Sequence, residues 1–292
     1  MVRRKHSGTV KHKKRKERKP RCSPRTKKLS YTCYSQRSLL RMKKFWNARH
    51  PDAEIHSNDP REIWRSLRER MRHSCRNERC WLKQKFIRDH LDPTLKNHTF
   101  APDAPESWQD KPDTWLNSLD IDRVMQQYEH IYPDFEFIGP SPIDFDKKKL
   151  YGSCVWEELC KFDLSKKLKE GVTKIGVVFN TDPHYKPGEH WIALYIDARA
   201  GYILFFNSTG EKILPEISRL VKRIQGQGKA IGLDLKLLQN HPFVHQHTTT
   251  ECGMYVLFVI VQLLTGKRKP EYFLKHRVPD KDMLDLRRIY FN

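Results

Sequence analysis

The chain has 292 residues, of which 38% are hydrophobic and 31% are charged, and its formal net charge is +21. This length fits one large domain or two smaller ones. The longest apolar stretch, residues 254–264, is far shorter than the ~20 residues that cross a bilayer, and no apolar segment of the signal-peptide kind follows the N-terminal charges. We therefore expect a soluble protein without a membrane span that is not exported through the secretory route.

The positive charge is concentrated at the N-terminus. Residues 1–28 contain 14 Lys and Arg against a single acidic residue, Glu17, and so carry +13 of the total of +21. They show no hydrophobic periodicity, and we expect a disordered tail over about residues 1–30. Because such a run condenses on polyanions, it predicts nonspecific nucleic-acid binding through residues 1–28, with a solubilising tail as the plainer alternative.

The seven cysteines are odd in number and widely spaced, at positions 22, 33, 75, 80, 154, 160 and 252. This usage favours reduced thiols in an intracellular compartment. Cys75 and Cys80 have a C-x4-C spacing that some zinc sites use, but only His73 lies close by as a further ligand. A buried contact at a helix turn is therefore the preferred interpretation, and we expect neither a metal nor another cofactor.

Hydrophobic periodicity divides the chain into two parts. Residues 38–95 predict a small helical module, with apolar clusters at helical spacing and a third helix through residues 81–87. Proline-rich, polar residues then indicate a linker. The expected division is a tail over 1–30, a helical arm over 31–100, a linker over 101–114 and a second domain over 115–292.

The second domain has the pattern of an α+β fold, with a central sheet and a buried helix against it. We expect strands at 175–179, 191–196, 202–206 and 231–238, a short extended piece near 135–138, and helices over 115–131, 214–224 and 252–264. The helix over 252–264 is apolar on nearly every side, as a buried helix is.

Cys252 opens that apolar helix and is followed by Gly253. A thiol at a helix N-terminus faces the positive end of the macrodipole, which lowers its pKa toward neutrality and favours the nucleophilic thiolate. Gly253 is expected to leave the backbone open to a substrate. A small buried residue at the start of a core helix is the alternative interpretation.

His190 and Asn207 stand at the adjoining ends of two consecutive predicted strands. If those strands are neighbours, the Asn207 oxygen can accept a hydrogen bond from one ring nitrogen of His190 and leave the other nitrogen facing Cys252. Asp197 is the competing partner, but it lies at the far end of the same strand, about 23 Å away. A surface histidine and a turn-capping asparagine remain the plain alternatives.

Gln246 precedes Cys252 by six residues, on an irregular loop. Its side-chain amide and the backbone N–H of Cys252 could form an oxyanion hole. A rival interpretation uses the same loop, where His241, His245 and His247 with Cys252 could hold zinc, but their spacing matches no common ligand motif.

Taken together, the segments GEHWIALYID (188–197), FNS (206–208), HQ (245–246) and TECGMY (250–255) resemble the superfamily of cysteine peptidases that joins adenain to the SUMO-specific proteases. The chain most resembles the polyprotein-processing proteases of large nucleocytoplasmic DNA viruses, including those of African swine fever virus and mimivirus. The resemblance implies an adenain-like α+β core with a mixed sheet, preceded by an arm domain. It also implies His190 as general base, Cys252 as nucleophile, Gln246 as oxyanion donor and Asn207 as orienter.

The same resemblance implies a viral endopeptidase that cleaves core or capsid polyproteins after Gly-Gly pairs, in the virion or at a cytoplasmic assembly site, with the nucleus as an alternative location. Trp191, Trp115 and Asn117 are the implied walls of the substrate channel. Two further hypotheses are a deconjugating peptidase for a ubiquitin-like modifier and a basic structural core protein that binds nucleic acid.

Overall fold

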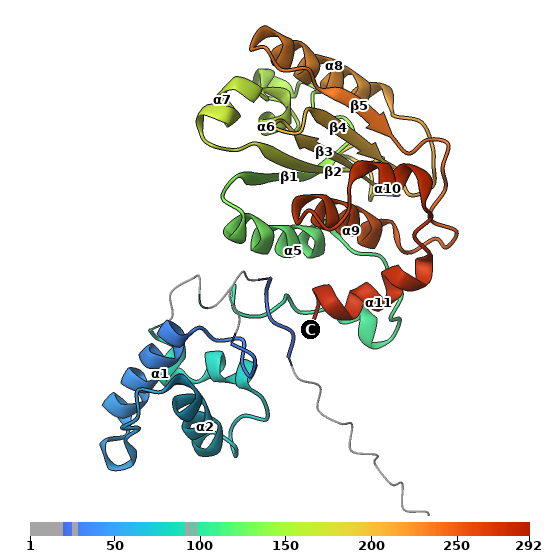
Figure 1. Cartoon of the computed structure of the whole chain (residues 1–292). Coiled ribbons are helices and arrows are strands. Elements are labelled where there is room, and N and C mark those ends of the chain that lie inside the picture. The colour runs from blue at the N-terminus through green and yellow to red at the C-terminus, as the bar shows by residue number, and fades with distance from the viewer. Residues whose placement is uncertain (1–19, 25–28, 91–94, 96–97) are drawn as a thin grey trace, which may run out of the picture.

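A computed structural model describes residues 20–24, 29–90, 95 and 98–292, and shows a helical arm beside a larger core domain built on a sheet (Figure 1). The predicted tail falls mostly outside the described residues. The helices of eight or more residues are α1 (Gln36–Arg49), α2 (Pro60–Arg70), α5 (Ser118–Ile131), α8 (Pro215–Ala230), α9 (Cys252–Leu264) and α11 (Asp280–Tyr290). The shorter ones are α3 (Lys85–Arg88), α6 (Glu157–Cys160), α7 (Leu164–Lys169) and α10 (Pro270–Lys275), with 3-10 turns η1 (Pro51–Ala53), η2 (Glu78–Lys83), η3 (Glu106–Gln109) and η4 (Leu150–Gly152).

The core domain contains a five-stranded mixed sheet in the order β1-β2-β3-β4-β5. Its strands are β1 (Phe135–Pro142), β2 (Lys174–Asn180), β3 (Trp191–Asp197), β4 (Tyr202–Phe206) and β5 (Lys236–Gln239). The central pairs β2–β3 and β3–β4 are antiparallel, and the outer pairs β1–β2 and β4–β5 are parallel. The expected α+β class and its mixed sheet are therefore present.

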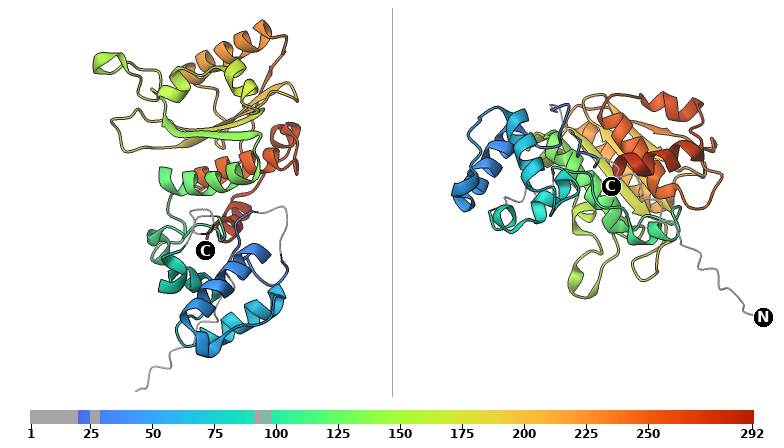
Figure 2. Two further views of the ribbon diagram at one scale, coloured as in Figure 1. Left: turned by 90° about the vertical axis from the view of Figure 1, so that its left-hand side faces the viewer. Right: turned by 90° about the horizontal axis from the view of Figure 1, so that it is seen from below.

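Helices cover both faces of the sheet, so the central strand β3 is buried along its whole length. Side chains alternate along a strand, and Trp191, Ala193 and Tyr195 accordingly join the cluster that contains α5 and α9. The intervening residues of β3 join the opposite cluster, with α7 and α8. Figure 2 shows the sheet between these two helical layers.

The apolar helix α9 lies in the centre of its layer, against β3 and between α5 and α11 (Figure 1). It begins at Cys252, as the sequence predicts, and eleven of its thirteen residues are buried. The expected strand over 231–238 is shorter than predicted, because α8 extends to Ala230 and its C-terminal turn takes up Ile231 and Gly232. Only residues 236–239 form β5.

The arm has its own hydrophobic core. Leu39, Met42, Ile63 and Leu67 from α1 and α2 are fully buried, and Trp81 from η2 closes the cluster. The expected third helix is broken into η2 and the single turn α3. A separate helical module is therefore present, with a less regular third segment than the periodicity indicates.

A buried acidic residue organises the arm. The Glu78 carboxylate, 7% exposed, accepts hydrogen bonds from the Thr32 hydroxyl (2.5 Å), the Cys33 backbone N–H (3.1 Å) and the Trp64 indole N–H (2.7 Å). These bonds tie the segment before α1 to α2 and η2, and they satisfy a charge that would otherwise be costly to bury.

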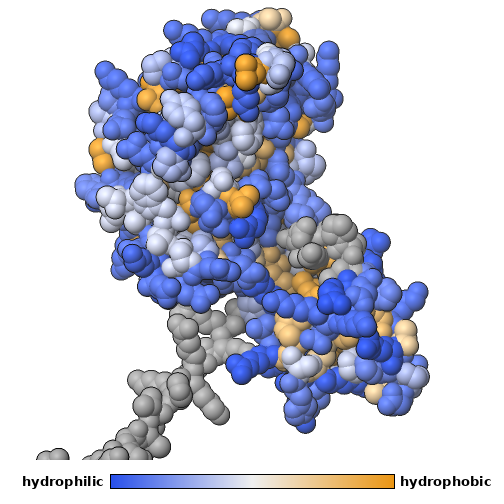
Figure 3. All heavy atoms as spheres, turned by 180° about the vertical axis from the view of Figure 1, so that it is seen from behind, coloured by the Kyte–Doolittle hydropathy of each residue, from blue (hydrophilic) through white to orange (hydrophobic). Residues whose placement is uncertain are grey.

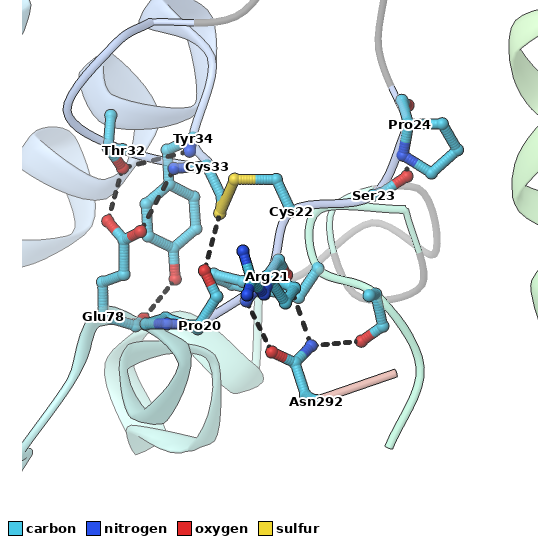
Figure 4. The surroundings of a disulfide bond; sticks show 12 residues. Pro20, Arg21, Cys22, Ser23, Pro24, Thr32, Cys33, Tyr34, Glu78 and Asn292 are labelled. Atoms are coloured by element: carbon cyan, nitrogen blue, oxygen red, sulfur yellow. Dashed lines mark hydrogen bonds between the residues drawn. A yellow bond between two sulfur atoms is a disulfide. The ribbon is translucent and has the colours of Figure 1, made fainter. Parts of the chain in front are cut away.

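The N-terminal described segment connects the arm with the core domain (Figure 4). Cys22 forms a disulfide with Cys33 and pairs in an antiparallel bridge with Phe100. The Arg21 backbone N–H donates to the side-chain oxygen of Asn292 (2.6 Å), which follows α11. Residues 20–24 are thus part of the fold, and the expected tail over 1–30 extends too far at this point.

The expectation of reduced thiols is wrong for six of the seven cysteines. They form three disulfides, Cys22–Cys33, Cys75–Cys80 and Cys154–Cys160, and only Cys252 is free. Each pair lies within 11 residues along the chain, so local turns bring the sulfurs together. The C-x4-C pair is therefore a crosslink at the turn after α2, and the compartment inferred from the cysteines loses its support.

The predicted linker packs against the core domain. Trp108 makes an edge contact with Phe291 at 5.2 Å between ring centroids, and its indole N–H donates to the Thr114 carbonyl (3.0 Å). From behind, hydrophilic residues cover most of the surface, and hydrophobic atoms gather where the arm adjoins the core domain (Figure 3). None of the helices in the described ranges has both the length and the apolar composition that a bilayer crossing requires.

Candidate active site

The four residues singled out in the sequence lie around one end of the central strands. His190 directly precedes β3, Asn207 directly follows β4, and Cys252 is the first residue of α9, which packs on β3. Gln246 lies on the loop between β5 and α9, and this loop folds back onto the residue after Asn207. Because β3 and β4 are antiparallel, the start of β3 lies beside the end of β4, and His190 and Asn207 are therefore neighbours.

The side chains of His190 and Asn207 are hydrogen-bonded, with 2.8 Å between Nε2 and Oδ1. This is the contact that the strand spacing predicts. The same Oδ1 accepts the backbone N–H of Thr209 (3.1 Å) and the Thr209 hydroxyl (2.8 Å). A backbone N–H can only donate, so Oδ1 is the acceptor and His190 Nε2 must carry the proton. In the neutral form of the ring, Nδ1 is then the unprotonated nitrogen, which is the atom that a general base requires.

Asn207 is itself fixed by a second asparagine that the sequence analysis missed. The Asn207 backbone N–H donates to Asn240 Oδ1 (2.9 Å), and Asn240 Nδ2 donates back to the Asn207 carbonyl (2.7 Å). Both residues are almost fully buried, at 3% and 1% exposure. The exchange mimics a pair of strand hydrogen bonds where β4 ends, and it holds the orienting side chain in place.

The loop before His190 is shaped by Asn180, at the end of β2. Asn180 Oδ1 accepts the backbone N–H groups of Asp182 (2.9 Å) and Glu189 (3.1 Å), which closes the loop into a compact turn. Gly188 has a φ of 101°, and a Cβ there would lie 2.8 Å from the Asn180 amide. Only glycine fits this close approach without strain, so the turn delivers His190 to a fixed position.

Cys252 is 1% exposed, and the backbone N–H of Trp191, the residue after His190, points to its sulfur. Burial raises the pKa of the Cys252 thiol, and the neighbouring Glu251 carboxylate raises it further. The backbone N–H groups of Trp191 and Gly253 oppose this rise. The expected lowering of the pKa by the helix start is therefore wrong for the free protein, because desolvation of the thiolate outweighs the N–H donors.

In the described structure the His190 ring makes no hydrogen bond to the Cys252 sulfur. The two residues are connected through Trp191, which follows His190 in the chain and whose backbone N–H points to the sulfur. Contacts between a nucleophile and its base are commonly loose without substrate and tighten in the complex. Burial therefore favours the protonated thiol of Cys252 in the free protein.

Gln246 is held with its side-chain oxygen inward. Gln246 Oε1 accepts the hydroxyl proton of Ser208 (2.6 Å), and Nε2 donates to the Thr248 carbonyl (2.7 Å). The Ser208 carbonyl also accepts the backbone N–H groups of His245 and Gln246, each at 2.9 Å. Because an amide nitrogen carries two protons, one N–H of Gln246 remains for an oxyanion.

The residues implied as channel walls differ in what they do. Trp191 is 8% exposed, and its indole N–H donates to the Leu116 carbonyl (2.9 Å). Trp115 is 44% exposed. Asn117 caps α5, since its Oδ1 accepts the Asp120 backbone N–H (2.9 Å).

The sequence predicts that Gly253 leaves its backbone open to a substrate, and the structure contradicts this prediction. A Cβ at this position would lie 3.0 Å from the Leu116 side chain. The glycine instead lets the segment before α5 pack directly on the start of α9. Leu116 is thereby fixed between Trp191 and the nucleophile helix, next to the exposed Trp115.

The zinc interpretation of the histidine loop does not fit the structure. His245 is fully buried; its Nδ1 accepts the Val278 N–H (3.2 Å) and its Nε2 donates to the Phe273 carbonyl (2.9 Å). Burial also lowers its pKa, so the ring is neutral. His241 Nδ1 is bonded to the Gly210 carbonyl (2.8 Å). Within the described ranges, no three His, Cys, Asp or Glu side chains are grouped as metal ligands.

Known proteins are similar to this chain in sequence and in fold. Residues 165–292 match the family model described as Ulp1 protease family, C-terminal catalytic domain. A thiol protease of Acanthamoeba polyphaga mimivirus is 26% identical over 267 residues, which cover 84% of this chain and 85% of the relative. The chain is a cysteine peptidase whose residues 165–292 match the Ulp1 family.

A cysteine protease of African swine fever virus is also similar to this peptidase, with 30% identity over 184 residues that cover 59% of the chain and 66% of the relative. The crystal structure of an African swine fever virus protease superposes with a TM-score of 0.67 at 23% identity, over 93% of this chain and 95% of that chain. The shared fold therefore includes the arm as well as the core domain.

Proposed function

We propose that this peptidase is a viral endopeptidase in which Cys252 is the nucleophile and His190 the general base. His190 Nδ1 takes the thiol proton, and the resulting thiolate attacks the substrate carbonyl carbon. The protonated ring then gives that proton to the leaving amine as the C–N bond breaks. A water molecule, deprotonated by His190, hydrolyses the thioester and regenerates the thiol.

Asn207 and Gln246 support this reaction in different ways. Asn207 Oδ1 holds the Nε2–H tautomer, so Nδ1 is available to the thiol in every cycle. The free N–H of Gln246 and the backbone N–H of Cys252 would donate to the oxyanion of the tetrahedral intermediate. The observation that carries the proposal is the His190–Asn207 bond, whose polarity is fixed independently by the Thr209 N–H.

We propose that the substrate is a viral polyprotein cut after a Gly-Gly pair. A hydrogen bond joins Trp191 to Leu116, and Leu116 packs against Gly253, which supports rigid apolar walls on the approach to Cys252. Glycines pass such walls because they carry no side chain. Exposed Trp115 would contact the residues before the cut, whereas the capping role of Asn117 makes it a support for this wall.

A deconjugating peptidase for a ubiquitin-like modifier is the rival function. Relatives of this chain in several African swine fever virus isolates bear the name SUMO-1 cysteine protease. The two functions differ in whether the body of a modifier is needed for recognition. Comparing an internal Gly-Gly-Xaa peptide with a ubiquitin-like protein that carries a C-terminal leaving group tests this directly.

We further propose that the peptidase acts in the virion or at a cytoplasmic assembly site, with its basic N-terminus on nucleic acid. Residues 29–100 carry 16 Lys and Arg against 8 Asp and Glu, whereas residues 101–292 carry 26 of each. All of the net charge therefore lies before residue 101, and the linker and core domain together have none. On α2, Arg61, Arg65 and Arg68 are exposed along the helix, so the arm offers cationic side chains of its own to a polyanion.

A further inference from the structure

A buried ion pair lies directly behind the nucleophile. Glu251 precedes Cys252 and is 1% exposed, and Arg287 on α11 is 4% exposed. Arg287 Nε donates to Glu251 Oε2 (2.9 Å) and Nη2 donates to Oε1 (2.8 Å). This is the bidentate geometry in which a guanidinium and a carboxylate interact most strongly.

The other donors of Arg287 all point to the backbone around the site. Nη1 donates to the carbonyls of Thr114 (2.8 Å) and Pro112 (3.2 Å). Nη2 also donates to the carbonyls of Asp113 (3.3 Å) and Thr250 (3.2 Å). One side chain therefore joins α11 to the residues before Cys252 and to the segment that leads into the channel wall at Trp115 and Leu116.

An aromatic ring stacks on the Arg287 guanidinium. The Arg287 Cζ atom lies 4.4 Å from the centre of the Trp108 ring, and the Trp108 indole N–H donates to the same Thr114 carbonyl that Arg287 binds. Stacking of this kind adds to the attraction when the cation is desolvated. The guanidinium is thus enclosed by groups that suit a planar cation, which a lysine could not replace.

This arrangement answers an electrostatic problem at the site. A buried carboxylate next to a thiol opposes formation of the thiolate, because like charges repel more strongly away from water. The groups around the start of α9 are Arg287 from α11, the Thr250 hydroxyl, which donates to Glu251 Oε1 (3.0 Å), and Tyr255 on α9 itself, whose hydroxyl donates to Asp280 of α11. Of these, only Arg287 brings a permanent positive charge to the Glu251 carboxylate.

We propose that Arg287 is a positioning residue of the peptidase: it neutralises the carboxylate that precedes the nucleophile and fixes the wall segment 112–116 against the start of α9. The inference rests on the proposed role of Cys252 as nucleophile. Arg287 touches neither the substrate nor the reacting atoms, and it acts through Glu251 and through the backbone of the wall.

The test is a charge cycle read by alkylation of the only free thiol, Cys252, with iodoacetamide across pH under non-reducing conditions. Arg287→Gln should shift the midpoint of alkylation upward by about one pH unit, and so slow the reaction at neutral pH about tenfold, because the charge of Glu251 is no longer neutralised. The double variant Glu251→Gln/Arg287→Gln should return the rate to within about twofold of wild type. Arg288→Gln, an exposed neighbour on α11, is the matched control and should change nothing.

If Arg287 had a purely structural role, the double variant would be alkylated no faster than Arg287→Gln, since it loses more hydrogen bonds than the single variant. A double variant as slow as Arg287→Gln would therefore overturn the proposal. If Arg287→Gln fails to fold, Arg287→Lys tests the proposal instead. Lysine keeps the positive charge but cannot make the two parallel hydrogen bonds of the guanidinium. The alkylation midpoint should therefore stay near that of the wild type, while kcat for the peptide falls about tenfold. A midpoint that moves as far in Arg287→Lys as expected for Arg287→Gln would contradict charge neutralisation.

The readout separates this proposal from the proposed function. If Cys252→Ala keeps its peptidase turnover, Cys252 is not the nucleophile and the proposed mechanism fails. The alkylation cycle would still report the electrostatics of the thiol in that case, because it does not depend on turnover.

Discussion

The supporting residue for the imidazole, Asn207, is uncharged. It fixes the tautomer of His190 but provides no counter-charge when the ring becomes an imidazolium. Burial and Glu251 also raise the pKa of the Cys252 thiol, which disfavours the thiolate in the free protein. In the proposed mechanism Asn207 therefore contributes through geometry.

Removing the ring should therefore cost more than removing its support. We expect His190→Ala to lower kcat/KM by about 10³-fold or more, because the base is lost. Asn207→Ala should lower it by about 10- to 100-fold, since the ring is present but free to turn. Steady-state kinetics on one peptide substrate checks this order, and an Asn207→Ala enzyme as inactive as His190→Ala would contradict a purely orienting role.

Ser208 is predicted to act through Gln246. Ser208→Ala removes the bond to Gln246 Oε1 and frees the amide to rotate away from the oxyanion position. We expect kcat to fall about tenfold with KM nearly unchanged, because the oxyanion exists only in the transition state. Measuring kcat and KM separately checks this, and a change confined to KM would argue against it.

The pH dependence of the thiol follows from the direction of its pKa shift. A raised pKa means that the folded protein holds the thiol proton more tightly than the unfolded chain does. The stabilisation is complete below the ordinary thiol pKa of ~8.5 and is lost as pH rises through the higher, folded value. Alkylation of Cys252 in the free enzyme should accordingly have its midpoint above that of a short cysteine peptide, and a midpoint at or below it would contradict the effect of burial.

At the scale of elements, the sequence predicted what local patterns can carry. Apolar runs between turns located the three central strands, and the start of α9 at Cys252 was predicted to the residue. The spacing of His190 and Asn207 sufficed for their contact, because one tight turn joins their strands. The short strand β5 was placed too early, since its half-exposed residues lack a buried run.

Groups that act across long sequence distances were not predictable in the same way. Asn240 meets Asn207 from 33 residues away, and Arg287 meets Glu251 from 36 residues away. Each is an ordinary polar residue in its own segment, on a loop or on the face of an amphipathic helix. The disulfides were missed because cysteine number and spacing were given more weight than the local turns that bring each pair together.

The Cys22–Cys33 disulfide should stabilise the junction of arm and core domain. Closing a loop of this length lowers the entropy of the unfolded chain and so raises its free energy by about 3 kcal/mol. We expect Cys22→Ser/Cys33→Ser to lower Tm by several degrees, with exchange of the arm amides increasing before those of the core. Thermal unfolding and hydrogen exchange measure this, and an unchanged Tm would show that the hydrogen bonds around Asn292 suffice without the crosslink.

At the scale of the whole molecule, the excess positive charge and the candidate active site lie in different parts of the chain. The linker and the core domain together, residues 101–292, have no net charge, while the tail and the arm carry the entire excess. Because residues 20–24 belong to the fold, the tail can be tested cleanly only by a truncation that ends before them. The same division suggests that attachment to a polyanion and peptide cleavage are independent properties.

Deleting residues 1–19 should weaken DNA binding at low salt and flatten its salt dependence, because fewer counterions are released. Peptide turnover should stay within about twofold of the full chain. A filter-binding titration at several salt concentrations, together with peptide kinetics, checks both. Equal DNA affinity with and without the tail would remove its proposed role.

The most direct test of the account compares the wild type with Cys252→Ala on an internally quenched Gly-Gly-Xaa peptide and, in parallel, on a ubiquitin-like protein with a C-terminal fluorogenic group. We expect the wild type to cleave the peptide, the variant to be inactive, and the modifier to be cut slowly or not at all. Turnover that survives in Cys252→Ala would contradict the mechanism. A strong preference for the modifier would replace polyprotein cleavage with deconjugation.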